Sequence, residues 1–406
     1  MNTICGCGVK AIPNRHYTPS TPPEFLSESA VLPVLRLHQG MEGYAPTPLV
    51  RLDGLAKALN VKAILIKDES QRFGLKAFKG LGGLYALTRV VCRQLELNPE
   101  TVTFKMLQSE TYAAKLKEMV FVTATDGNHG KGIAWAAGLL GCRAHVYMPK
   151  GSTQARAQAI REAGKAEVTI TDLGYDDTVK LAASLAVKNG WHLVQDTSWD
   201  GYEEIPTWII QGYTTMAAEA AGQLKREGIA APTHVFLQAG VGAMAGSMTG
   251  YLANRYREAP PAFITAEPED MACIYTSIQS EDGAAHAVSG DSSTIMAGLN
   301  CGEPCTVTWP VLRNFVSWST ACSDRVAALG MRILAAPLSN DPPVTSGESG
   351  AITTGLLALL ASRDDLKDVR DRMGLNADSV ILLFNTEGDT DPQRYQEIVY
   401  GGRYSF

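Results

Sequence analysis

Lys79 lies where its amine could act as a nucleophile. It belongs to the stretch KDESQRFGLKAFKGLGG, in which a polar loop leads into a helix expected to begin near Phe78 and Lys79. A helix N-terminus carries partial positive charge, which disfavours a further cation and helps to keep an amine neutral. A neutral lysine can form a Schiff base with a carbonyl compound. By residue type alone, a solvated lysine is the commoner outcome, because most lysines are exposed.

Two further polar residues follow a predicted strand that ends at Thr123 or Ala124. The stretch VTATDGNHGKGIAWAAGLLG places Asp126 and Asn128 in the turn between this strand and an apolar helix. Asn128 can donate or accept a hydrogen bond, and Asp126 can act as an acid or a base. Both residue types also favour helix N-caps. The residues alone therefore leave a cap and a catalytic site equally open.

A glycine-rich loop is predicted between a strand and a helix in THVFLQAGVGAMAGSMTG. Gly240 and Gly242 would let backbone N–H groups approach a phosphate at a helix N-terminus. The spacing to Ala245 also fits the dinucleotide pattern G-x-G-x-x-A, and Glu267 ends the next predicted strand, where a ribose-binding acid would lie. Such a match is weak by itself, and close packing of helix on sheet is the alternative. The strand-loop-helix context favours the phosphate.

Three other polar clusters follow apolar runs or precede helices. Asp196, in VQDTSWDGYEEIPTW, could bind an amine or belong to an ordinary turn. Glu348, in SGESGA, and Thr386, in NTEGDTD, could supply groups around a ring. Turn chemistry is the alternative for both.

The elements that must position these residues alternate along the chain. Short β-branched runs predict buried parallel strands; they begin at Val61, Met119, Ala144, Ala166, Thr233, Ala262 and Ser379. Helical patterns between them begin near Phe78, Asn128, Thr153, Asp176, Pro206, Ala243, Asp324 and Gly350. This alternation predicts a doubly wound α/β fold with ligands at the carboxyl ends of the strands. The first 45 residues and the polar stretch from Ser280 are expected to be loops.

Composition narrows the class of protein. The chain has 406 residues, 45% of them hydrophobic, and a formal net charge of -6. This indicates a globular protein of two or three domains, and the absence of a Lys and Arg cluster argues against nucleic-acid binding. No apolar run reaches the length of about 18 residues that a membrane helix needs, and the start lacks the apolar stretch of a secretion signal. We therefore expect a cytoplasmic protein that does not bind membranes.

The cysteines predict neither a disulfide scaffold nor a metal site. Eight cysteines are few for a chain of this length, and a reducing compartment would keep them as thiols. Cys5 and Cys7, like Cys301 and Cys305, have no second pair at zinc-ligand spacing.

The order of these motifs resembles the fold-type II family that depends on pyridoxal phosphate (PLP), which includes threonine dehydratases, cysteine synthases and the tryptophan synthase β chain. Within it, the stretches are similar to those of diaminopropionate ammonia-lyases, over roughly residues 40–400: GLKAFKGLGG, ATDGNHGKGIAWAA, MPKGSTQAR, DTSWDGYEEIPTW, LQAGVGAMAG, TIMAGLNCGEP, SGESGA and NTEGDTD. The resemblance implies two doubly wound, mainly parallel sheet domains with PLP in the cleft between them, and a homodimer. Residues 1–90 and 190–406 would form the large domain, and residues 91–189 the small inserted one.

The resemblance also assigns cofactor-binding residues. Lys79, after Phe78, would hold PLP, and Asn128 would contact the ring hydroxyl. Thr386 is the first choice for the pyridine nitrogen, with Glu348 lining the site. The residues that would hold the phosphate are Gly240, Val241, Gly242, Ala243, Met244 and Ala245.

The implied reaction is α,β-elimination of 2,3-diaminopropionate, in its L and D forms, to pyruvate and two ammonia. Lys79 would take the Cα proton from the L isomer, and Asp126 from the D isomer. Dehydratases usually carry Ser-Ala or Ser-Ser where this chain has Thr125 and Asp126. Asp126 and Asp196 would favour the β-ammonium group and so select a diamino acid over serine.

One departure and three alternatives stay open. Lys76 stands where the lyase motif has a neutral residue such as Asn, and could influence Lys79 or point into solvent. A serine or threonine dehydratase is the first alternative, against which Asp126 speaks. An NAD(P)-dependent oxidoreductase using Gly240, Gly242 and Ala245 leaves the Lys79 motif unexplained. The third is a PLP-holding protein without activity.

Overall fold

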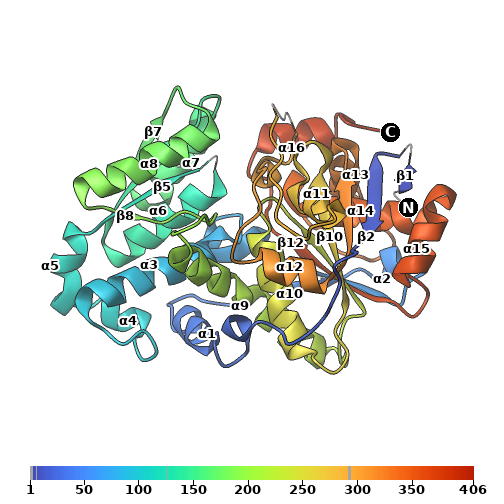
Figure 1. Cartoon of the computed structure of the whole chain (residues 1–406), viewed down its shortest axis with the longest axis horizontal. Helices are drawn as coiled ribbons and strands as arrows, with labels where there is room; N and C mark the ends of the chain where they lie inside the picture. The colour runs from blue at the N-terminus through green and yellow to red at the C-terminus, as the bar shows by residue number, and fades with distance from the viewer. Residues whose placement is uncertain (1–2, 6, 126, 291–293) are drawn as a thin grey trace. The chain divides into compact units, whose positions relative to one another are not determined.

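The computed structural model describes residues 3–5, 7–125, 127–290 and 294–406 (Figure 1). Their contacts divide the chain into two units. Unit 1 consists of residues 1–27, 46–77 and 216–406, and unit 2 consists of residues 28–45 and 78–215. The predicted small domain, residues 91–189, falls inside unit 2 along the sequence, and its boundaries stay a prediction.

Unit 1 is built on a sheet that has eight strands within the described ranges, in the order β1-β2-β11-β10-β9-β12-β4-β3. The strands from β11 to β4 run parallel, and β2 and β3 pair antiparallel at either side of them. The central strands are almost wholly buried apolar runs, as helices on both faces of a parallel sheet require. Their bounds are β1 Thr3–Cys5, β2 Val9–Pro13, β3 Leu49–Arg51, β4 Ala63–Asp68, β9 His234–Gln238, β10 Ala262–Pro268, β11 Val316–Cys322 and β12 Val380–Asn385.

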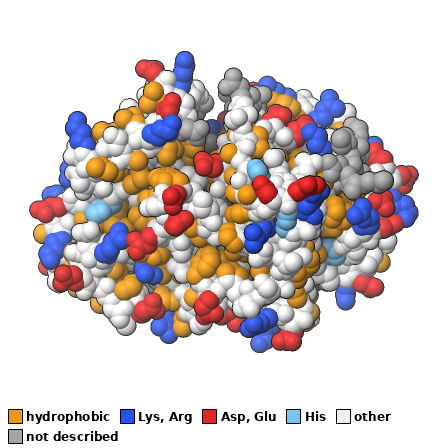
Figure 2. Space-filling view, viewed as in Figure 1, with side chains coloured by type: hydrophobic (Ala, Val, Ile, Leu, Met, Phe, Trp, Pro, Cys, Tyr) orange, Lys and Arg blue, Asp and Glu red, His pale blue; other side chains and the backbone are white. Residues whose placement is uncertain are grey.

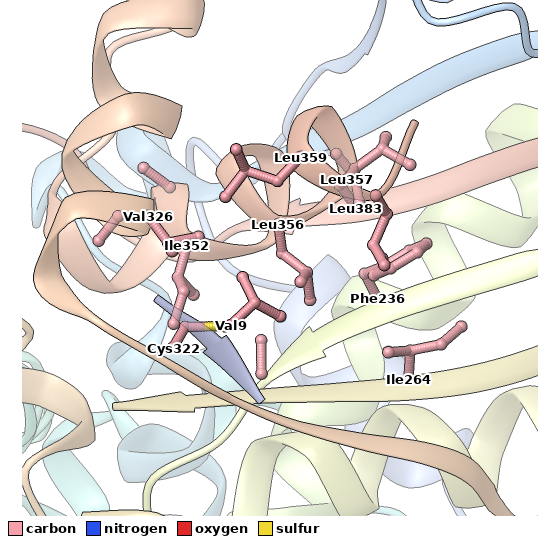
Figure 3. Close-up of a cluster of buried hydrophobic side chains, with 14 of the residues drawn as sticks. Val9, Phe236, Ile264, Cys322, Val326, Ile352, Leu356, Leu357, Leu359 and Leu383 are labelled. Atoms are coloured by element: carbon pink, nitrogen blue, oxygen red, sulfur yellow. The ribbon is translucent and has the colours of Figure 1, made fainter. Parts of the chain in front are cut away.

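The helices of unit 1 cover this sheet. They are α2 Asp53–Ala58, α10 Ala243–Arg255, α11 Cys273–Gln279, α12 Trp309–Phe315, α13 Asp324–Ala335, α14 Glu348–Ser362, α15 Lys367–Met373 and α16 Pro392–Val399, with the 3-10 turns η1 Glu24–Leu26, η2 Glu69–Gly74, η3 Glu269–Met271, η4 Ala297–Leu299 and η5 Asp364–Leu366. Helices α13 and α14 approach so closely that a Cβ on Gly330 would lie 2.0 Å from Ala351 O. Ile352 and Leu356 of α14 and Val326 of α13 join the apolar core in Figure 3.

Unit 2 contains a smaller sheet in the order β7-β6-β5-β8, with every pairing parallel. Its strands are β5 Val120–Ala124, β6 Arg143–Met148, β7 Glu167–Ile170 and β8 His192–Leu193. Its helices are α1 Leu32–Gln39, α3 Lys79–Leu95, α4 Phe104–Leu107, α5 Glu110–Glu118, α6 Asn128–Leu140, α7 Gln154–Gly164 and α8 Tyr175–Asn189. Helix α9, Glu204–Arg226, has residues in both units.

Most of the predicted elements are confirmed. The structure is an α/β protein with two mainly parallel sheets, and each expected helix begins within two residues of the predicted position. The prediction that the first 45 residues are loop is wrong, because they contain β2 and α1. Strand β2 is stabilised by antiparallel pairing with β11, a contact between residues some 300 positions apart that local sequence does not reveal.

Two negative findings hold for the residues that the structure describes. No helix among them is long and apolar enough to cross a membrane. They contain no group of three or more His, Cys, Asp or Glu side chains placed to hold a metal ion. Acidic and basic side chains are interspersed over the face seen in Figure 2.

A buried ion cluster in unit 1 joins the end of β4 to helix α9. Lys67 Nζ lies 2.5 Å from Glu219 Oε2, and Arg72 contacts both Glu219 Oε1, at 2.9 Å, and Glu69 Oε2, at 2.7 Å. All four side chains are at most 4% exposed. Buried charges require such partners, and a charge that loses its partner is costly.

We therefore predict that Glu219→Gln destabilises the protein by about 3–5 kcal/mol, because Lys67 and Arg72 lose a buried partner. Urea denaturation measures this. Glu204→Gln on the same helix is the matched control, since its pair with Arg93 is exposed and should be worth less than about 1 kcal/mol. Equal losses in the two variants would show that burial of the cluster does not matter.

Candidate active site

Lys79 is the first residue of α3, and its amine meets a carboxylate. Its Nζ lies 2.5 Å from Asp196 Oδ2, and both side chains are largely buried, 22% and 14% exposed. The rings of Phe78 and Tyr213 lie 5.3 and 5.8 Å from Nζ. The carboxylate favours the ammonium form of the lysine and so opposes the effect of the helix N-terminus.

Close packing holds the start of α3 in place. A Cβ on Gly132 of α6 would lie 3.0 Å from Lys79 C and Gly80 N, and a Cβ on Gly82 would lie 2.5 Å from Tyr213 Cε1. Larger residues at these positions would displace backbone or a buried ring. Helix α6 therefore rests directly against the backbone of Lys79.

Asp196 follows β8 and is ionised. Burial alone would raise its pKa, but the nearby His129 and Lys79 more than offset this and lower the pKa of Asp196 to about 2. The sequence left open whether Asp196 belonged to a turn or bound an amine. In the structure, it binds the amine of Lys79.

His129, the second residue of α6, is a member of this cluster that sequence reasoning missed. Its Nε2 lies 2.9 Å from Val194 O, a pure acceptor, so Nε2 carries a proton. Its Nδ1 lies 3.6 Å from Asp196 Oδ2. Burial lowers the pKa of His129, and this outweighs the attraction of Asp196. The signal was available, because His129 directly follows Asn128 at the end of a predicted strand.

The turn before α6 is organised by Thr125. Its Oγ1 accepts hydrogen bonds from Gly127 N, at 3.0 Å, and Gly130 N, at 3.2 Å. Asn128 is the first helical residue, with Gly127 at the N-cap position, so Asn128 does not have the N-cap role that the sequence left open. Asp126 lies outside the described residues, and its role stays a prediction from sequence.

The glycine loop of unit 1 follows β9 and opens α10, as predicted. Its carbonyl oxygens are engaged by neighbours: Gly240 O accepts from Cys273 Sγ at 3.4 Å, Val241 O from Cys305 N at 2.7 Å and Gly242 O from Gly246 N at 2.8 Å. The acceptors are thus turned onto protein donors. Gly242 has a φ of +88°, and no side chain caps the N-terminus of α10 within the described part of the chain.

These features fit the phosphate group of PLP. A helix N-terminus with open N–H groups and a glycine-rich approach binds anions. A Cβ on Gly242 would lie 2.6 Å from Leu312 Cδ1, and one on Gly240 would lie 3.1 Å from Leu299 Cα, so a side chain at either position would crowd its neighbours.

Glu267 does not fit the role of a ribose-binding acid. It is fully buried at the end of β10. Its Oε1 accepts from Ile274 N at 2.8 Å and its Oε2 from Tyr275 N at 2.7 Å. Both oxygens are therefore used by the first turn of α11, and the dinucleotide interpretation of this loop is wrong.

Thr386 lies beside the glycine loop because β12 and β9 are neighbours in the sheet. Gln238, the last residue of β9, donates from Nε2 to Thr386 Oγ1 at 2.8 Å. The threonine oxygen therefore accepts one hydrogen bond and keeps its own proton to donate. This arrangement suits a ring nitrogen that accepts a hydrogen bond.

Glu348 is buried at the start of α14. Burial raises its pKa to about 7, and the charge of Glu387 acts in the same direction. Glu387 Oε1 accepts from Ser349 N at 3.1 Å, and Arg394 Nε lies 3.9 Å from Glu348 Oε1. Glu348 is therefore partly protonated near neutral pH. Its place at the site stays a proposal.

Lys76 pairs with a carboxylate of unit 1. Its Nζ lies 2.8 Å from Asp389 Oδ1, and both side chains are substantially exposed. Its φ of +59° lies in the left-handed region, where Asn is well tolerated. This explains why Asn is suited to the position.

The fold and these two groups of residues are those of a PLP-binding enzyme: a lysine at a helix start, and an anion-binding loop at a strand end. A family model described as pyridoxal-phosphate dependent enzyme matches residues 41–370. The chain therefore belongs to the family of pyridoxal-phosphate dependent enzymes.

One curated sequence and two crystal structures narrow the reaction class to which the chain is similar. The chain is 48% identical to diaminopropionate ammonia-lyase of Escherichia coli (strain K12), over 97% of this chain and 96% of that one. A crystal structure of the Escherichia coli enzyme with an aminoacrylate-PLP azomethine reaction intermediate has a TM-score of 0.90, 45% identity, and coverage of 98% and 99%. Another, in complex with D-serine, has a TM-score of 0.91, 46% identity, and coverage of 98% of both chains.

Proposed function

We propose that the protein is a PLP-dependent carbon-nitrogen lyase that converts 2,3-diaminopropionate and water to pyruvate and two ammonia. The observation that carries this proposal is the buried contact between Lys79 Nζ and Asp196 Oδ2. It places the amine assigned to PLP beside an ionised carboxylate that suits a second amino group. The 48% identity to a diaminopropionate ammonia-lyase supports the choice of substrate.

PLP, when bound, supplies an electron sink for the charge that develops at Cα. We assign its covalent attachment to Lys79, its phosphate to the loop from Gly240 to Ala245, and its ring hydroxyl to Asn128. Thr386 donates to the pyridine nitrogen, and Glu348 lines the site.

Asp196 selects the substrate through charge. The β-amino group cannot depart as an amide anion, so it must be protonated before the carbon-nitrogen bond breaks. A Lys79 amine that held PLP would no longer be the ammonium group that Asp196 faces. The substrate's β-ammonium then becomes the cation that satisfies the buried carboxylate. Serine offers only a neutral hydroxyl and gains less from it.

The Cα proton leaves towards a different group for each isomer. Lys79 would take the proton of the L isomer, and Asp126 would take that of the D isomer from the other face. The complex of the Escherichia coli enzyme with D-serine supports access for D-amino acids.

The proposal extends to the assembly, compartment and small domain of the protein. The protein acts as a homodimer in the cytoplasm, in amino-acid catabolism, and its small domain comprises residues 91–189. The similarity to a diaminopropionate ammonia-lyase over nearly the whole of both chains favours this reaction over that of a serine or threonine dehydratase.

The reaction and its anchoring lysine can be tested together. Wild-type protein with PLP should show the visible absorbance of a lysine-bound cofactor and release ammonia and pyruvate from 2,3-diaminopropionate in a ratio of two to one. Lys79→Ala should abolish the band and reduce turnover by at least about 10³-fold, because nucleophile and base are both lost.

Lys76→Asn is the control, three residues away, and should retain band and turnover, since Asn tolerates the left-handed backbone there. A persistent band in Lys79→Ala would mean that another lysine holds PLP. Wild-type protein that binds PLP without releasing pyruvate would instead be a binding protein without activity.

Asp126→Asn separates the two isomers. We expect kcat/KM for D-2,3-diaminopropionate to fall by about 10²–10⁴-fold, the usual contribution of a general base, and that for the L isomer to fall far less. Steady-state assays on the separate isomers measure this. Equal losses would rule out proton removal from two faces.

A further inference from the structure

Helix α11 packs against the glycine loop. Cys273 Sγ donates to Gly240 O at 3.4 Å. On the same turn, Ile274 Cδ1 lies 3.1 Å from where a Cβ on Gly242 would be. The first contact binds the carbonyl group of Gly240, and the second fills the space beside Gly242. A shift of α11 would therefore shift the backbone of the loop.

Helix α11 is too short to hold its own position. It has seven residues, Cys273–Gln279, and its N-cap residue Ala272 provides no side-chain cap. Helices of this length are unstable without tertiary contacts. Its first N–H groups nevertheless have acceptors, because Glu267 binds Ile274 N through Oε1 and Tyr275 N through Oε2.

Glu267 in turn is fixed to the strand next to the loop. It lies near the end of β10, whose Ala266 pairs with Gln238 of β9, two residues before Gly240. Its side chain is fully buried, and burial raises the pKa of Glu267 to about 8 against the opposing effect of the Ile274 and Tyr275 N–H groups. A fully buried carboxyl group is unfavourable unless it is hydrogen-bonded. The bonds of Glu267 to Ile274 N and Tyr275 N therefore hold α11 in position.

We infer that Glu267 is a positioning residue for the phosphate site. By binding the first turn of α11, it fixes the helix against which Gly240 and Gly242 pack, and so fixes the N–H groups that these glycines present. This inference rests on the proposed PLP site. It gives the carboxyl group a role in phosphate recognition without any contact to the cofactor.

Comparison of PLP with pyridoxal, which lacks the phosphate, isolates this role. In wild-type protein, equilibrium titration followed by absorbance should show PLP binding much more tightly than pyridoxal. Glu267→Gln keeps the shape but offers only one acceptor oxygen. We expect Kd for PLP to rise about 10-fold, the effect of about one lost buried hydrogen bond, and Kd for pyridoxal to change less than about 2-fold. Glu267→Asp, one methylene shorter, should not restore the preference.

The control is His234→Gln. His234 is buried at the other end of β9, where its Nε2 contacts Met373 O at 3.0 Å, so the variant loses a buried contact far from the loop. It should lower Tm while leaving the ratio of the two Kd values intact. If the ratio of Kd for pyridoxal to Kd for PLP were preserved in Glu267→Gln, the inference would be overturned but the phosphate site would stand. The same holds if that ratio fell equally in His234→Gln. Wild-type protein that binds both aldehydes equally would overturn the phosphate site itself, and the inference with it.

Discussion

The buried carboxylate of Asp196 requires a cation beside it. Two unit charges a few ångströms apart interact far more strongly in the protein interior than in water, so an unpartnered Asp196 would be costly. Lys79 Nζ supplies that partner at 2.5 Å. His129 lies farther from the carboxylate, with its Nδ1 3.6 Å from Asp196 Oδ2, and burial lowers the pKa of His129. Whenever the lysine amine is engaged elsewhere, a second cation is favoured at the same place, and a diamino acid carries one.

The surrounding backbone is arranged to keep this contact fixed. Gly132 lets α6 press against the start of α3, and Thr125 organises the turn that places His129. In unit 1, Cys273 and other neighbours bind the carbonyl oxygens of the glycine loop. The loop can therefore present its N–H groups to an anion. Each site thus depends on close packing around residues that carry little chemistry themselves.

Sequence reasoning predicted the parts of the fold that local pattern determines. Buried apolar strands and their following helices were placed within two residues, because apolar runs and polar turns are local signals. Strand β11 was missed because its sequence, VSWSTAC, mixes polar and apolar residues although nearly all of them are buried. Strand β2 was missed because its stability comes from pairing with β11.

The same limit applies to the site. Residues at strand ends and helix starts, such as Lys79 and Asp196, could be proposed from position, whereas their contact could not. Glu267 was misassigned because its spacing fits a dinucleotide pattern, while its partners, Ile274 and Tyr275, depend on how α11 folds back. Lys76 could be recognised as unusual, but its pairing with Asp389 joins segments far apart in sequence.

Charge selection by Asp196 is tested most directly by comparing two substrates in Asp196→Asn, which keeps the shape of the side chain but removes its charge. The account predicts that kcat/KM for 2,3-diaminopropionate falls at least about 100-fold, as for loss of a buried charge pair, while kcat/KM for serine changes less than about 10-fold. Equal losses for both substrates would contradict it.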